Sequence, residues 1–397
     1  MSAGQYNLPD LQGISNVISA RYFLARSDAI REKIDYFVES IGYGVGQTTD
    51  QIGLSIFPCS EMLSKPRKVV NILNKGILDD EWIYIDVGVQ LKNSNFSVLG
   101  FAGLLSYFAG DIFGAPYTKT GLVLEKLVLP KELISFFPGP KYGDEDVLLK
   151  ANGQAGKRHI LGLLLKPNNG VPPNYYADIV EAAVQGGIEY IKEDELTMDS
   201  KECPRFKRIS MISKRLSKSG KNILYAANIT APSHHLFKTA LRAVEAGASA
   251  ILVNGLYVGF DAVSFLASNS KIKVPIHWHR AGYDILSSGV KAISVPCLTE
   301  LFRLAGADIV HVGSPLGGVF SKDVVWENCR RLEIPINNVK RSIPVFSRSS
   351  IDTIAVIRNN SNIRGSIILF DAYIYNSPLG IEKAAKNIND RLKDGDV

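Results

Sequence analysis

Residues 160–195 read ILGLLLKPNNGVPPNYYADIVEAAVQGGIEYIKEDE and contain a complete repeating unit of the fold. The run Ile160–Lys166 is almost entirely aliphatic and is followed by the turn sequence Pro-Asn-Asn-Gly. Residues 174–185 then carry apolar side chains at helical spacing, and Ile188–Lys192 is a second apolar run. A strand, a helix and a second strand in this order predict a βαβ unit with two parallel strands.

The same pattern recurs along the rest of the chain as a short β-branched or leucine-rich run, a turn and a helix-periodic stretch. Strands are predicted at Ile160–Lys166, Ile188–Lys192, Ile223–Asn228, Ala250–Asn254, Val274–His277, Ile309–His311, Ile343–Val345 and Ser366–Phe370. Helices are predicted at Asn174–Gln185, Pro204–Ser217, His234–Ala246, Asp261–Ser268, Leu298–Ala305, Lys322–Arg331, Ile351–Asn359 and Ile381–Leu392. These eight pairs predict an α/β fold with a C-terminal (β/α)8 TIM barrel, which usually takes roughly 250 residues. An open doubly wound sheet is the alternative.

The chain before about residue 142 follows a different pattern. Its predicted elements are strands at Ile18–Leu24 and Trp82–Gln90 and helices at Asp28–Ile41 and Gly100–Phe108. We therefore expect a smaller N-terminal α+β domain of the ferredoxin-like kind over residues 1–142 and the catalytic barrel over residues 143–397. The join, Phe137–Gly143, contains two prolines and two glycines, which disfavour a continuous helix or strand.

Composition excludes several classes of protein. The 397 residues are 46% hydrophobic and 21% charged, which argues against intrinsic disorder and coiled coil. The net charge of +6 is spread too thinly for a nucleic-acid interface but suits a small anionic substrate. No apolar run is long enough to span a bilayer and no leader pattern opens the chain, so we expect a cytoplasmic protein. Four cysteines without a CxxC pair encode neither a disulfide framework nor a zinc ribbon.

If the strands close into a barrel, the polar residues at their C-terminal ends meet at one mouth, where barrel enzymes build their active sites. The candidates, in chain order, are Lys166, Lys192, Asp194, Glu195, Asn228, His277, His279, Arg280, His311 and Ser347. Taken singly, Asn228 and Ser347 are more typical of turn or helix-cap residues.

The segment KEDE at 192–195 is the most informative of these strand ends. Asp194 and Glu195 directly follow an apolar strand and supply the hard oxygen ligands that Mg²⁺ prefers. Lys192 is a ligand only after chemical modification, because an ammonium group has no lone pair. A solvated charged turn is the alternative for an isolated string of this kind, and the other polar strand ends favour the metal site.

Lys166 and the histidines admit two interpretations each. Lys166 is either a surface lysine or a partly desolvated base, since it ends an apolar strand and precedes Pro167. His277 and His279 alternate along one strand, so both face the barrel interior or mouth while Trp278 points towards the helices. A lone histidine is more often structural, but two histidines with Arg280 indicate an oxyanion site.

Together these segments resemble the large-subunit superfamily of ribulose-bisphosphate carboxylase (RuBisCO), and more closely its divergent RuBisCO-like proteins. The family motifs Gly-x-x-x-Lys-Pro-x-x-Gly and Gly-Gly-x-x-x-x-Lys-x-Asp-Glu are present at 162–170 and 186–195. Further similar segments are ISARY at 18–22, FPGPKYG at 137–143, YAANIT at 225–230, HWHRAG at 277–282, LAGAD at 304–308, HVG at 311–313 and PVFS at 344–347. The resemblance covers nearly the whole chain.

The resemblance implies roles for the strand-end residues. Lys192, carbamylated by CO₂, would bind Mg²⁺ with Asp194 and Glu195. Lys166 would transfer a proton, and His279 would contact a substrate oxygen. Arg280 with His311 would bind an anionic group, with Asn228 and Ser347 as further substrate contacts. A homodimer or a multiple of dimers is implied, with the N-terminal domain of one chain completing the site of another.

The chain also departs from the family pattern. The loop that delivers a lysine in carboxylating members has Gly318 at the corresponding place, and Lys322 is expected to belong to the next helix. Glycines that cradle one of two phosphates in the family are replaced by Arg348-Ser349 and Asp371-Ala372-Tyr373. The family asparagine in the N-terminal domain falls on Asp111, either a replacement catalytic base or an ordinary loop aspartate.

These residues lead to one expected function and one alternative. We expect a Mg²⁺-dependent RuBisCO-like lyase or isomerase that forms an enediolate on a sugar-acid or ketose derivative with one anionic group. The enediolate arises either by deprotonation or by loss of CO₂, and we expect no carboxylation of ribulose bisphosphate. The alternative is a noncatalytic ligand-binding or assembly protein, which the retention of several buried charges disfavours.

Overall fold

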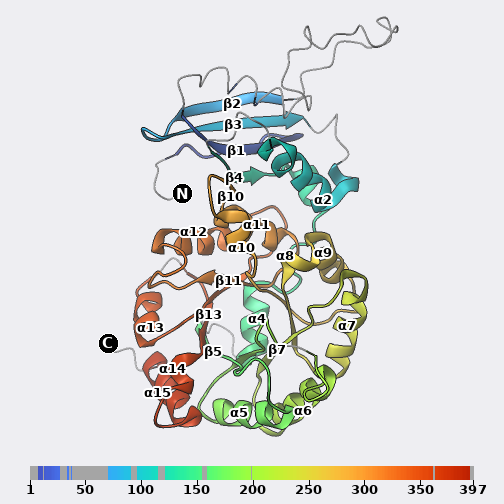
Figure 1. Ribbon diagram of the computed structural model, residues 1–397, viewed down its shortest axis with the longest axis vertical. Helices are drawn as coiled ribbons and strands as arrows, with labels where there is room; N and C mark the ends of the chain where they lie inside the picture. Colours follow the sequence, from blue (N-terminus) through green and yellow to red (C-terminus); the bar gives the residue numbers. More distant parts are fainter. Residues whose placement is uncertain are drawn as a thin grey trace, which may run out of the picture. The chain divides into compact units, whose positions relative to one another are not determined.

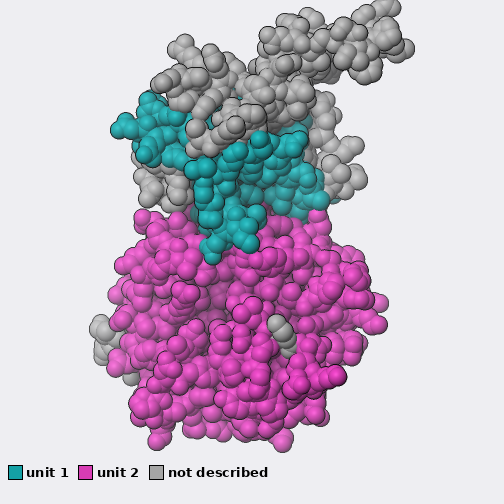
Figure 2. All heavy atoms as spheres, viewed as in Figure 1, with its two compact units in different colours: residues 1–136, 284–298 teal, residues 137–283, 299–397 magenta. Residues whose placement is uncertain are grey.

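The computed structural model describes residues 8–11, 13–26, 34, 37, 70–90, 96–114, 121–153, 159–197, 199–360 and 363–393. The chain forms two compact units, coloured teal and magenta in Figure 2. The first comprises residues 1–136 and 284–298, and the second comprises residues 137–283 and 299–397. The return of residues 284–298 to the first unit had no signal in the sequence.

A five-stranded sheet forms the first unit, in the order β10-β4-β1-β3-β2. Its strands are β1 (Val17–Ala25), β2 (Val70–Ile77), β3 (Trp82–Gln90), β4 (Leu122–Val128) and β10 (Lys291–Ile293), and its helical segments include α2 (Phe96–Ala109), η4 (Asp111–Phe113) and α3 (Lys131–Ile134). β1 pairs antiparallel with β3 and β4, and β10 pairs parallel with β4. The predicted α+β character is confirmed, although β2, β4 and β10 were missed. Most of the predicted helix Asp28–Ile41 lies outside the described residues.

Eight parallel strands close into a barrel in the second unit, in the order β11-β12-β13-β5-β6-β7-β8-β9 (Figure 1). They are β5 (His159–Leu164), β6 (Tyr190–Lys192), β7 (Leu224–Asn228), β8 (Ala250–Val253), β9 (Ile276–Trp278), β11 (Ile309–Gly313), β12 (Ile343–Phe346) and β13 (Ser366–Phe370). The predicted barrel is therefore confirmed, and the open-sheet alternative is wrong.

Helices surround these strands (Figure 1). They are α5 (Pro173–Gln185), α6 (Arg205–Lys218), α7 (Ser233–Glu245), α8 (Gly255–Val258), α9 (Phe260–Ser268), α11 (Val295–Leu304), α12 (Lys322–Glu333), α13 (Ile351–Arg358), α14 (Ala372–Tyr375) and α15 (Ile381–Lys393). α10 (Tyr283–Ser287) lies almost entirely in the segment 284–298 of the first unit, and α11 begins in that segment. Lys322 begins α12, as expected from the sequence. No helix in the described part of the chain is long and apolar enough to cross a membrane.

The interior of the barrel is a packed apolar core. Strand residues such as Ile160, Leu252 and Ile367 join one buried cluster with Val147 and Ala151 of α4 (Gly143–Asn152). Those two residues follow the join between the units, and helix α4 was not among the helices predicted from the sequence. The core layers hold the strands in register and leave their C-terminal ends to carry polar groups.

Asp308 ties the start of α4 to the barrel. Its Oδ1 accepts the backbone N–H groups of Tyr142 and Gly143 at 2.7 and 3.0 Å, and its Oδ2 accepts that of Ile276 at 2.9 Å. Burial raises the pKa of the Asp308 carboxyl from its ordinary value of 3.8 to about 6, although these N–H groups favour the charged form.

This raised pKa predicts how stability depends on pH. Between about pH 4 and 6 native Asp308 holds a proton that the unfolded chain has released, so native stability falls as pH rises through this window, by up to about 3 kcal/mol. Asp308→Asn removes this dependence. The difference in free energy of unfolding between wild type and the variant should therefore become smaller from pH 4 to pH 7. Urea denaturation across this range measures the difference, with Asp390→Asn at an exposed position of α15 as control. A constant or widening difference would contradict the assignment.

Candidate functional site

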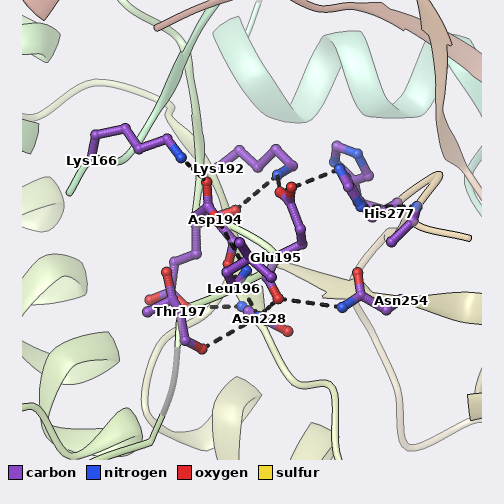
Figure 3. Close-up of polar contacts among 12 residues, drawn as sticks. Lys166, Lys192, Asp194, Glu195, Leu196, Thr197, Asn228, Asn254 and His277 are labelled. Carbon is purple, nitrogen blue, oxygen red and sulfur yellow. Dashed lines mark hydrogen bonds and ion pairs between the residues drawn. The ribbon is translucent and has the colours of Figure 1, made fainter. Parts of the chain in front are cut away.

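Two neighbouring strands bring a lysine and a carboxylate together. β5 pairs with β6 so that Leu164 lies opposite Lys192, and Lys166 and Asp194 follow two residues beyond each of these positions. Lys166 Nζ lies 2.5 Å from Asp194 Oδ2 (Figure 3). The Asp194 side chain is 1% exposed and that of Lys166 is 38% exposed, so the lysine remains accessible to a ligand.

Lys192 is fully buried beside this pair. Its Nζ donates to the Glu193 carbonyl oxygen at 3.0 Å and contacts Glu195 Oε2 at 3.2 Å. Burial lowers the pKa of Lys192, while the carboxylates of Glu195 and Asp194 oppose this change. The neutral amine that burial favours is also the nucleophilic form of a lysine.

His279 completes the cluster on the side of β9. Its Nε2 lies 3.2 Å from the same Glu195 Oε2, and its Nδ1 accepts the Ala281 N–H at 3.2 Å. Since Nδ1 accepts, Nε2 carries the proton and donates to Glu195. Burial and the nearby charge of Lys192 hold the pKa of His279 well below its ordinary value, so the ring is neutral. The predicted residues thus form two neighbouring groups of contacts, Lys166 with Asp194, and Lys192 with Glu195 and His279.

Asn228 stabilises the loop that carries the Asp194 and Glu195 carboxylates. Its Nδ2 donates to the carbonyl oxygens of Asp194 and Glu195, each at 3.1 Å, and its Oδ1 accepts the Thr230 N–H at 3.0 Å. Asn254 Nδ2 also donates to the Glu195 carbonyl oxygen at 3.3 Å (Figure 3). The Asn228 amide group therefore orients this loop, and its expected contact with substrate stays a prediction.

Glu193 has a structural role that the sequence did not reveal. Its carboxylate forms a buried ion pair with Arg208 of α6 at 2.7 Å and accepts the Tyr225 hydroxyl at 2.6 Å and the Asn228 N–H at 2.9 Å. Burial opposes the charge of Arg208, but Glu193 raises the pKa of that guanidinium. The sequence signal for this role was the alternation of side chains along Lys192, Glu193 and Asp194. Alternation places the Glu193 side chain on the side of the strand opposite to Lys192 and Asp194.

The remaining predicted anion site lies at β9 and β11. His311 is 3% exposed, its ring lies 4.9 Å from that of His279, and neither of its nitrogens has a hydrogen-bond partner among the described residues. The guanidinium of Arg280 lies 4.9 Å from the ring centroid of Phe320. Trp278 packs against Phe302, as its expected outward orientation requires.

The ends of β12 and β13 border a separate hollow of about 800 Å³. Arg348 and Asp371 both line it, together with Tyr373 and residues at the start of α15. Arg348 adopts a left-handed φ of 55°, which glycine tolerates without strain. Asp371 Oδ1 accepts the Ala372 N–H at 2.7 Å, so the Asp371 carboxylate already occupies a backbone donor that an anionic ligand would otherwise use. The sequence indicated the loss of glycines here, and the positive charge that Arg348 adds to the hollow was not predicted.

Two other predicted residues lie apart from these contacts. Ser347 directly follows β12, and its backbone N–H donates to the Gly313 carbonyl oxygen at 3.2 Å. Asp111 is an exposed residue of η4 in the first unit.

Unmodified, the described residues place no group of three His, Cys, Asp or Glu side chains where a metal ion would bind. The donor set at Lys192 therefore suits a metal only if the lysine contributes an oxygen. The charges agree with that condition: Lys166, Lys192, Asp194 and Glu195 sum to zero as two ion pairs. A carbamate on Lys192 would change the sum to −2, which a divalent cation neutralises.

The chain is similar to known proteins in sequence and in fold. Residues 145–330 match the family described as the ribulose bisphosphate carboxylase large chain, catalytic domain. A ribulose bisphosphate carboxylase-like protein from Archaeoglobus fulgidus is 35% identical over 260 residues, 62% of this chain and 56% of that protein. A 2,3-diketo-5-methylthiopentyl-1-phosphate enolase from Geobacillus kaustophilus is 29% identical over 315 residues, 77% of this chain and 74% of that protein.

A solved RuBisCO-like protein from Alicyclobacillus acidocaldarius shares the fold. It superposes with a TM-score of 0.81 at 23% identity, covering 95% of this chain and 93% of that one. In sequence, the chain spans between 53% and 56% of the length of the Archaeoglobus relative and two further curated relatives.

The different surroundings of Glu193 and Glu195 predict different effects on stability. Glu193→Gln leaves Arg208 buried without its counter-ion and should cost about 3–5 kcal/mol. Glu195→Gln should cost less, because the buried Lys192 amine can release its proton when its counter-ion is lost, whereas the Arg208 guanidinium cannot. Urea denaturation of both variants measures the difference. Equal losses would show that Glu193 is not the structural carboxylate of this loop.

Proposed function

Since the chain belongs to the ribulose bisphosphate carboxylase large-chain superfamily as a divergent RuBisCO-like member, we propose that it is a Mg²⁺-dependent enzyme that stabilises an enediolate. The substrate is a sugar-acid or ketose derivative with one anionic group. The observation that carries the proposal is the pair Lys166–Asp194 beside the group formed by Lys192, Glu195 and His279 at the end of the barrel.

Lys192, Asp194 and Glu195 would hold the metal, with Lys192 contributing as its carbamate. The charge balance described above supports this assignment, since the modification and a divalent cation together restore neutrality in a buried place. Mg²⁺ bound there would act as a Lewis acid on two adjacent substrate oxygens. Asn228 keeps both carboxylates at the loop end through its bonds to their backbone.

Lys166 is the proposed proton-transfer group. Its accessible side chain reaches the Asp194 carboxylate, which places its amine next to the proposed metal ligands. His279, neutral and protonated on Nε2, would donate to a substrate oxygen on the other side of the cluster. Taking a proton from the carbon beside the carbonyl and stabilising the resulting oxyanion are the two tasks that enediolate formation requires.

One end of the substrate is proposed to be anionic. Arg280 provides a planar fork of donors, and His311 offers ring nitrogens that have no partner among the described residues. At the β13 end, the positive charge of Arg348 is offset by the negative charge of Asp371, whose Oδ1 already accepts the Ala372 N–H. This difference favours a monophosphate or a carboxylate over a bisphosphate.

The same site suits two routes to the enediolate, deprotonation and loss of CO₂ from a β-keto acid. The named activity of the Geobacillus relative, an enolase, favours the first route. The proposal includes a homodimer, in which Asp111 of one chain serves the barrel of the other.

Hydrogen exchange at carbon tests the proposal. With Mg²⁺ and bicarbonate in D₂O, at least one member of a panel of phosphorylated and nonphosphorylated sugar acids and ketoses should lose a C–H proton signal. Lys166→Met should slow this exchange by about a hundredfold or more, because a general base is removed. Lys386→Met, at an exposed position of α15, is the matched control and should retain the wild-type rate.

Exchange that is equally fast in Lys166→Met, or no exchange with any compound, would refute enolisation by Lys166. The panel includes β-keto acids, with CO₂ release as a second readout. Release that needs Lys192 but not Lys166 would assign the decarboxylation route.

A further inference from the structure

A polar pair lies inside the barrel one layer below the site. Tyr190 of β6 and His277 of β9 are both 0% exposed, in a core otherwise built from residues such as Leu224 and Ile309. The Tyr190 hydroxyl forms a hydrogen bond with His277 Nδ1, and the two rings stack with centroids 6.0 Å apart. Barrel interiors are normally filled by aliphatic side chains, so a buried polar pair at this position is unusual and calls for a physical explanation.

The hydrogen bond fixes the tautomer of His277. A tyrosine hydroxyl, whose ordinary pKa is about 10, carries its proton at neutral pH. Burial, and then the charge of Lys192, hold the pKa of His277 well below its ordinary value, so the ring is neutral. With no other acceptor for its proton in the described structure, the tyrosine donates to Nδ1, and the histidine proton lies on Nε2.

His277 Nε2 is then a buried donor without an acceptor among the described residues. Buried donors in folded proteins are nearly always paired, so this N–H is expected to meet an acceptor that the unmodified chain does not supply. His311, whose ring lies 4.8 Å away, forms no hydrogen bond with it.

Lys192 is where a new acceptor would arise. Tyr190 and Lys192 are two residues apart on β6, so their side chains lie on the same side of the strand. His277 and His279 are likewise two residues apart, at β9 and just beyond it. His279 already reaches the Glu195 oxygen that contacts Lys192 Nζ. The pair Tyr190–His277 thus lies below the contacts that join Lys192 to His279.

The present surroundings of Lys192 suit a cation and not an anion. The groups bonded to its Nζ are a carbonyl oxygen and a carboxylate, both of which only accept. When the neutral amine attacks CO₂, an N–C bond forms, one C=O π bond becomes an oxyanion, and the nitrogen releases a proton to solvent. A buried carbamate anion is costly unless a donor faces it.

We propose that His277, oriented by Tyr190, donates its Nε2–H to the carbamate formed on Lys192. This inference rests on the proposed function, because it requires Lys192 to react with CO₂. It assigns His277 and Tyr190 as positioning residues that stabilise the modified lysine, without contact to the substrate.

Three substitutions separate this role from general packing. His277→Gln places an amide N–H near the position of Nε2, whereas His277→Asn reaches only as far as Nδ1. Tyr190→Phe removes the hydroxyl that fixes the tautomer. Tyr22→Phe, which removes a fully buried hydroxyl bonded to the Phe108 carbonyl oxygen in the first unit, is the matched control.

The experiment measures carbamate formation directly. Each variant is titrated with ¹³C-bicarbonate in the presence of Mg²⁺, and the carbamate is followed by ¹³C NMR and by chemical trapping with mass spectrometry at Lys192. His277→Asn should weaken CO₂ uptake about tenfold or more, as expected for loss of a hydrogen bond to a charged group. His277→Gln should recover most of the uptake, and Tyr22→Phe should match wild type.

The ¹⁵N spectrum of the His277 ring gives a second readout that does not depend on CO₂. Wild type should show the Nε2–H tautomer, and Tyr190→Phe should show a mixture of tautomers with weaker CO₂ uptake. Uptake in His277→Asn equal to wild type, or an Nδ1–H tautomer in wild type, would overturn the inference alone. Absence of any carbamate in wild type would overturn the proposed metal site and this inference with it.

Discussion

The balance of charge around Lys192 is the constraint on which the site depends. A fully buried lysine is tolerated only with compensating partners, and here Glu195 and the Glu193 carbonyl oxygen provide them while Lys166 compensates Asp194. Each of these groups comes from the end of β5 or β6 or from the loop after β6. The parallel pairing of β5 with β6 therefore determines whether the charges of Lys166, Lys192, Asp194 and Glu195 are paired.

Groups that do not bond to Lys192 keep this balance in place. Arg208 holds Glu193 on the helix side of β6, and Asn228 holds the backbone of the next two residues. Below them, Tyr190 and His277 add a neutral polar layer to an apolar core. Asp308 performs a related task at the other end of the strands, where it ties the start of α4 to the barrel.

The barrel, and the position of the candidate site residues at the ends of its strands, were predictable because both follow from local patterns. Alternating apolar runs and helix-periodic stretches locate the strands, and the residue after each strand end is then a site candidate without further information. Tertiary roles left weaker signals. Alternation along β6 places Glu193, which pairs with Arg208, on the side away from Lys192, but it places Glu195 on that same side although Glu195 contacts Lys192. The return of β10 to the first sheet and the tautomer set by Tyr190 depend on contacts between distant segments.

The most direct test is calorimetric titration of the protein with Mg²⁺, with and without bicarbonate, for wild type and for Lys192→Ala. If Lys192 becomes a ligand only as its carbamate, Mg²⁺ should bind wild type tightly when bicarbonate is present and much more weakly when it is absent. Lys192→Ala should bind weakly in both conditions. Equal Mg²⁺ affinity with and without bicarbonate, or tight binding to Lys192→Ala, would contradict a metal site built on modified Lys192.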